Sequence, residues 1–227
     1  AIAVIYNSDG TFKEYFYPKC PSYHTFINTR IIADSPDSLL WAGIGDALSK
    51  EYEVLFATRA EELFHTTLLG AQLSKACTAP LIDFGAKALE DCKANKASYE
   101  LEQVALDIII STGIVSNLTS GGEKYYYNSS LGHAFYYGST VIPKAEKHLH
   151  GEVVSFGVLC LLTYDNQLEE RERIMKFHKT IGLPTCLADM EITEEDIPAI
   201  VEKASTVREW TCVCKILKKK PHCIRKK

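Results

Sequence analysis

Three polar side chains stand in stretches that a helical protein would bury. Asp46 follows Gly45 among small and apolar residues, and His133 and His150 lie at the edges of two further apolar stretches. A carboxylate is costly to bury without a partner. One carboxylate and two imidazoles would supply three ligands of a tetrahedral zinc or iron site with an open fourth position, as catalytic metals use. The spacing alone leaves a simpler alternative open, in which Asp46 caps a helix and each histidine is a hydrogen-bonded core residue.

The elements that would position these side chains are mostly helical. A first helix is predicted from Ser35, which would be the N-cap, with Pro36 at the first helical position. Gly43 and Gly45 are expected to weaken it just before Asp46. Apolar periodicity predicts further helices over residues 47–63, 80–94, 99–115, 122–137, 151–164, 168–181 and 194–204.

The first residues differ, because β-forming side chains dominate them. Residues 2–7 and 11–17 flank the turn sequence NSDG and predict a β-hairpin, and residues 25–32 predict a further extended piece. An isolated hairpin is marginally stable and needs a sheet or helix to cover it. We therefore expect residues 1–34 to be the remnant of another domain, residues 35–210 to form a multi-helix bundle, and residues 211–227 to be a basic tail.

The net charge and the lengths of the apolar runs make a nucleic-acid-binding protein and a membrane protein unexpected. The chain has 227 residues and a net charge of −4, and residues 215–227 hold seven basic residues and no acid. Subtracting these seven charges leaves −11 on the rest, which argues against a nucleic-acid partner. The tail is expected to be a solvated, mobile end. We expect no membrane segment, since the longest apolar run noted, residues 153–162, is short, and we expect a cytoplasmic protein because no signal peptide is recognisable.

Five stretches resemble one known family. They are residues 31–36 (IIADSP), 39–48 (LLWAGIGDAL), 131–134 (LGHA), 148–153 (HLHGEV) and 181–184 (IGLP). Together they are similar to the motifs of glycerol dehydrogenases in the iron-containing alcohol dehydrogenase superfamily, in the same order and over roughly residues 1–205. The resemblance implies the dehydroquinate synthase-like fold, of which this chain would be the second, helical domain, after a hairpin remnant of a Rossmann-like domain.

The resemblance also implies a metal centre and a reaction. In that family Asp46, His133 and His150 would hold zinc or iron, and the hydroxyl of a small polyol would take the open position. The cation would lower the pKa of that hydroxyl so that hydride can pass to NAD. His148 would point elsewhere or support the site. Relatives form dimers to octamers, so we expect a homo-oligomer.

The family pattern leaves alternatives. Lys50 stands where classical iron-dependent members carry a further histidine, which favours the polyol type. A glycerol-1-phosphate dehydrogenase would share the three ligands, with Lys124 or Lys144 as candidate phosphate contacts. No G-x-G-x-x-G turn occurs in the sequence, so NAD is expected only with a nucleotide-binding half that is missing here. A catalytically silent helical module is therefore a further alternative.

Overall fold

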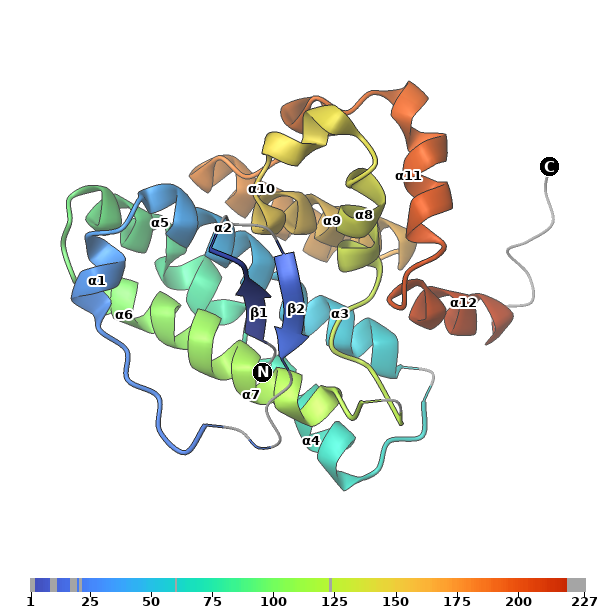
Figure 1. Cartoon of the computed structure of the whole chain (residues 1–227), viewed down its shortest axis with the longest axis horizontal. Helices are drawn as coiled ribbons and strands as arrows, with labels where there is room; N and C mark the ends of the chain where they lie inside the picture. The colour runs from blue at the N-terminus through green and yellow to red at the C-terminus, as the bar shows by residue number, and fades with distance from the viewer. Residues whose placement is uncertain are drawn as a thin grey trace.

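The protein folds mainly as a set of packed helices with one small β-hairpin (Figure 1). The computed structural model describes residues 3–8, 12–16, 20, 22–59, 61–122 and 124–219. The mainly α fold class predicted from the sequence is confirmed.

The hairpin at the start of the chain is also confirmed. Strands β1 (Ala3–Tyr6) and β2 (Phe12–Phe16) pair antiparallel, with Ala3 opposite Phe16. The extended piece expected over residues 25–32 is wrong in its second half, because helix α1 (Thr29–Ala33) forms there. The Asn28 side chain accepts a hydrogen bond from the Arg30 backbone N–H at 3.0 Å and so caps this helix.

The remaining elements follow as α2 (Asp37–Ala47), α3 (Ser49–Thr58), α4 (His65–Ser74), α5 (Ala79–Lys93), α6 (Tyr99–Leu106), the π-helical turn η1 (Asp107–Ser111), α7 (Thr112–Thr119), α8 (Leu131–Ser139), the 3₁₀ turn η2 (Pro143–Lys147), α9 (His150–Tyr164), α10 (Leu168–Ile181), the 3₁₀ turns η3 (Leu187–Met190) and η4 (Glu194–Asp196), α11 (Ile197–Ala204) and α12 (Trp210–Lys219). The predicted helices over residues 80–94, 151–164 and 168–181 are confirmed to within a residue at each end.

Helix α2 departs from the prediction in two ways. It begins at Asp37 with Pro36 at the N-cap position, and the Ser35 hydroxyl instead donates a hydrogen bond to the Ile32 carbonyl. Its two glycines do not interrupt it, since the helix runs unbroken to Ala47. Close packing against another helix compensates for their low helix propensity, as described below.

Two predicted helices have wrong boundaries. The helix expected over residues 47–63 ends at Thr58, and α4, which the periodicity did not indicate, follows it. The helix expected over residues 122–137 begins only at Leu131. Before it the chain folds back, with a bridge between Ser120 and Tyr126 and a positive φ of 64° at Gly122. A left-handed glycine of this kind ends a helix rather than continuing it.

The predicted helix over residues 99–115 continues to Thr119 through the turn η1. By length and composition the stretch Tyr99–Thr119 could cross a membrane, and 28% of its most apolar window is buried within the fold. The expectation that no stretch reaches this length was therefore wrong. It overlooked this helix because the acids Glu100, Glu102 and Asp107 interrupt its apolar residues.

In the last part of the chain, a predicted helix end and a predicted capping box are confirmed, and the predicted tail is partly wrong. Gly182, with φ at 77°, ends α10, and Thr193 and Asp196 form the predicted capping box. The tail expected from residue 211 is helical up to Lys219, because α12 buries Cys212 and Val213 against the bundle. Residues 220–227 of that tail lie outside the described residues.

The main core lies between α2, α3, α5, α6, α9 and α10. Its largest fully buried apolar side chains include Ile44, Phe56, Leu81, Leu162 and Ile174. This packing fixes α2, α3 and α9 relative to one another. These three helices and α8 carry the candidate site.

Candidate metal centre

Asp46 lies in the last turn of α2, where the helix meets the start of α9. Gly45 makes this approach possible, because a Cβ atom there would lie 2.5 Å from the Gly151 carbonyl oxygen. Heavy atoms cannot approach so closely, so the two backbones are in direct contact. The residue after Gly45 and the residue before Gly151 are therefore neighbours, and these are Asp46 and His150.

A second glycine contact places His133. A Cβ atom on Gly157 of α9 would lie 2.5 Å from the Gly132 carbonyl oxygen of α8. The contact holds the first turn of α8 against α9, and His133 follows Gly132 directly. Asp46, His133 and His150 are thus each next in sequence to a glycine at which two helices approach closely.

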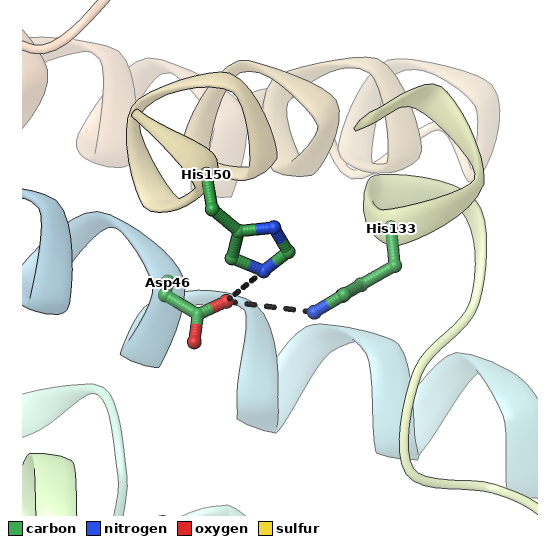
Figure 2. A group of neighbouring side chains, drawn as sticks. All are labelled: Asp46, His133 and His150. Carbon is green, nitrogen blue, oxygen red and sulfur yellow. Dashed lines mark ion pairs between the residues drawn. The ribbon is translucent and has the colours of Figure 1, made fainter. Parts of the chain in front are cut away.

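The three side chains converge, as Figure 2 shows. The Nε2 atoms of His133 and His150 lie 3.4 and 3.3 Å from the Asp46 Oδ1 atom, and all three ligand atoms lie within 4.8 Å of one another. A tetrahedral zinc site with bonds of about 2.0–2.1 Å separates its ligand atoms by about 3.3–3.4 Å. The distances from Asp46 Oδ1 therefore match those around a shared cation.

The polar atoms of the group also fit a cation. The Asp46 Oδ1 atom is buried and makes no hydrogen bond of normal geometry in the structure. Its neighbours are the two imidazoles at 3.3 and 3.4 Å, and a cation shared between the three side chains would satisfy this oxygen. Among the described residues, this is the one group of three or more His, Cys, Asp or Glu side chains that could hold a metal.

The site is open on one side. His133 is 14% exposed, whereas His150 and Asp46 are 40% and 46% exposed. The Tyr136 ring packs edge-on against the His150 ring at 4.2 Å between centroids and supports it from α8. A ligand can therefore approach the group over Asp46 and His150.

Electrostatic coupling within the group is strong. Burial acts to raise the pKa of Asp46, but the two imidazoles outweigh it and hold that pKa far below its usual value. Burial lowers the pKa of His133, yet Glu53 and Asp46 together raise it to about 10. In the absence of a cation, a proton on His133 therefore compensates the two carboxylates.

Glu53 is a member of this network that the sequence analysis missed. It lies on α3, is fully buried, and places its Oε2 atom 2.6 Å from the His133 Nδ1 atom. Burial acts to raise its pKa, but the charge and hydrogen bonds of His133 lower it. One signal was available in the sequence, since Phe56 and Ala57, three and four residues after Glu53, make the helix face of this acid apolar.

The Lys50 side chain contacts the loop before α8. Its Nζ atom donates hydrogen bonds to the Asn128 side-chain oxygen at 2.7 Å and to the Asn128 carbonyl at 3.4 Å. Burial lowers its pKa, while the charges of Asp46 and Glu53 act against that shift. Lys50 thus holds the loop before α8 and takes no part in the ligand set.

The other candidate residues lie elsewhere. His148 contacts Glu152, with 2.8 Å between Nδ1 and Oε1, and its Nε2 atom is 3.9 Å from a Glu191 oxygen. Lys144 is exposed on the turn η2, and its charge acts on Glu191. Lys124 is exposed in the loop before α8. Neither lysine makes a hydrogen bond or ion pair with the three converging side chains in the described part of the chain.

Comparison with known proteins points to one family. The chain is 33% identical over 221 residues to the glycerol dehydrogenase of Escherichia coli, and 31% identical over 218 residues to that of Thermotoga maritima. These matches cover 93% and 92% of this chain but 56% and 57% of the relatives, so the chain spans about half their length. No family model matches the chain.

A solved structure agrees with these matches. The probable glycerol dehydrogenase of Sinorhizobium meliloti superposes with a TM-score of 0.77 and 27% identity, over 94% of this chain and 60% of that protein. Sequence and structural similarity together confirm the resemblance to glycerol dehydrogenases that the motifs indicated, over about half the length of those proteins.

Proposed function

We propose that this chain is the metal-binding part of an NAD-linked oxidoreductase that oxidises glycerol or a related small polyol. The observation that carries the proposal is the convergence of Asp46, His133 and His150 at distances that suit one tetrahedral cation. The names of the similar proteins support glycerol as the first substrate to test.

In this proposal Asp46, His133 and His150 hold zinc or iron through one carboxylate oxygen and two Nε2 atoms. The cation supplies Lewis acidity, which lowers the pKa of an alcohol hydroxyl. The exposed sides of Asp46 and His150 leave room for the substrate. NAD is held by a nucleotide-binding part, since the sequence contains no glycine-rich phosphate turn.

An apolar groove lies along the helix that carries Asp46, toward its N-terminal end. It is lined mainly by apolar residues of α2 and the turn η1, among them Leu39, Gly43 and Ile109. Leu39 and Gly43 precede Asp46 by seven and three residues and share its helix face. In this proposal the groove is a candidate contact for the carbon side of the substrate.

The test has two stages. The purified chain should bind one equivalent of zinc in chelator competition, and Asp46→Asn should weaken that binding strongly. The chain should then be joined to the nucleotide-binding part of the Thermotoga maritima relative, and glycerol-dependent formation of NADH should be measured. Activity that Asp46→Asn abolishes would support the proposal. Zinc binding without NADH formation, in a fusion that binds NAD, would favour the catalytically silent module.

A further inference from the structure

The Glu53 carboxylate makes its hydrogen bonds with the segment that carries His133. Its Oε1 atom accepts hydrogen bonds from the backbone N–H groups of Ser130 at 2.7 Å and His133 at 3.0 Å. Its Oε2 atom lies 2.6 Å from the Nδ1 atom of the His133 ring. Glu53 belongs to α3, so these three contacts join α3 to the first turn of α8.

These contacts replace an ordinary helix cap. No side chain of α8 caps its own N-terminus, and the first N–H groups of a helix need acceptors. Glu53 supplies an acceptor from another helix, and its negative charge suits the positive end of the α8 dipole. Gly132 leaves room for it, since a Cβ atom there would lie 3.1 Å from Glu53 Oε1.

The same carboxylate decides which ring nitrogen of His133 carries hydrogen. An ionised carboxylate can accept but not donate, so the nitrogen facing it, Nδ1, must donate. When a cation displaces the second proton of the ring, the lone pair that becomes free is therefore the one on Nε2. The Nε2 atom lies 3.4 Å from Asp46 Oδ1, so this lone pair would face the cation of the proposed function.

We propose that Glu53 is a positioning residue that fixes the His133 ring and its Nδ1–H tautomer for metal binding through Nε2. The inference rests on the proposed function, which makes a metal ion the ligand of His133. Partners of this kind orient metal ligands and typically change metal affinity 10–100-fold when removed.

Glu53→Gln provides a sharp test because glutamine has nearly the same shape. If the amide oxygen keeps the two backbone N–H groups, its NH₂ group faces His133 Nδ1 and selects the Nε2–H tautomer, which cannot bind a metal through Nε2. If the amide turns round, its NH₂ group meets the two backbone N–H groups and those bonds are lost. Either arrangement should weaken zinc binding by about 10- to 100-fold in chelator competition.

Glu152→Gln is a matched control in the same chain. Glu152 also contacts the Nδ1 atom of a histidine, His148, at 2.8 Å and accepts a backbone N–H, that of Leu149, at 3.1 Å. It differs in that its histidine, His148, lies outside the three converging side chains, whereas the histidine of Glu53 belongs to them. Its substitution should leave zinc affinity unchanged within error. An equal loss in both variants would show a general structural effect and would overturn the inference.

A measurement on the unmodified chain covers the case in which Glu53→Gln fails to fold. Nitrogen-15 NMR of the zinc-loaded protein should show His133 protonated at Nδ1 and coordinated through Nε2. Coordination through Nδ1, or unchanged zinc affinity in a folded Glu53→Gln variant, would refute the role of Glu53. Failure of the unmodified chain to bind zinc at all would instead refute the proposed function.

Discussion

Gly151 lies so close to Ala42 that a Cβ atom on the glycine would be 1.8 Å from the Ala42 carbonyl oxygen. This contact joins the N-terminus of α9 to the last turns of α2. It sets the distance between His150 and Asp46, which no hydrogen bond of normal geometry fixes in the structure. The metal centre therefore depends on the absence of a side chain at Gly151.

Gly151→Ala should consequently separate α2 from α9. We expect a loss of about 1–3 kcal/mol in the free energy of unfolding from overpacking, together with loss of zinc binding. Urea unfolding and chelator competition would measure the two effects. Gly113→Ala is the control, because a Cβ atom there meets nothing within 4 Å. It should stabilise the protein by about 0.5–1 kcal/mol through helix propensity. A stable Gly151→Ala variant that binds zinc normally would contradict the packing argument.

His150→Ala should abolish metal retention, because the loss of one of three ligands leaves the cation poorly held. His148→Ala should retain most of the metal, since the His148 side chain faces Glu152 and Glu191. Zinc content after dialysis, determined by mass spectrometry, distinguishes the two variants. Normal zinc stoichiometry in His150→Ala would show that this ligand was assigned wrongly.

Zinc binding should release protons at neutral pH. The pKa of His133 is raised to about 10 by Glu53 and Asp46, so the metal-free site holds a proton that a cation at Nε2 must displace. Affinity should therefore rise by about tenfold per pH unit through the neutral range and level off as the pH approaches 10. Calorimetry in buffers of different ionisation enthalpy should detect about one proton released per zinc. Binding independent of pH between 7 and 8 would rule out this competition.

His178 should make the fold sensitive to acid. It is fully buried, its Nδ1 atom lies 2.8 Å from the Pro184 carbonyl, and burial lowers its pKa to about 4. A depressed histidine pKa contributes stability that is complete above about 6.5 and is lost as the pH falls toward 4. The full contribution is about 3 kcal/mol.

The check is a comparison of unfolding free energies at pH 7 and pH 4.5 for the unmodified chain and for His178→Asn. Asparagine keeps an N–H donor for Pro184 but does not titrate. The variant should lose less stability between the two pH values. Equal losses would mean that other groups, such as Glu53 with its lowered pKa, account for the acid response.

The sequence indicated the three converging side chains better than it indicated the elements that hold them, while their role as metal ligands stays a prediction. Asp46, His133 and His150 were recognisable because their motifs resemble those of a known family, and the long helices α5, α9 and α10 because their apolar patterns are strong. The loop before α8 was not predictable in this way. Its course depends on the positive φ at Gly122 and on hydrogen bonds from Lys50 to Asn128, which join residues 78 positions apart.

Glu53 was missed for a related reason. Helical periodicity indicates which face a residue occupies, but the partner of a buried acid comes from another part of the chain. The three N–H donors that satisfy Glu53 lie between Ser130 and His133, about 80 residues away. The two glycine contacts are equally non-local, so Gly45 was read as a weak point of α2 although it is where α2 meets α9.

The unequal exposure of the three proposed ligands has a practical consequence for handling this chain. His133 is enclosed, while His150 and Asp46 face solvent, so a chelator can attack a bound ion from the open side without unfolding the protein. The metal found after purification would then record the composition of the buffers more than the preference of the site. Identification of the native ion requires reloading the stripped chain with competing metals at controlled free concentrations.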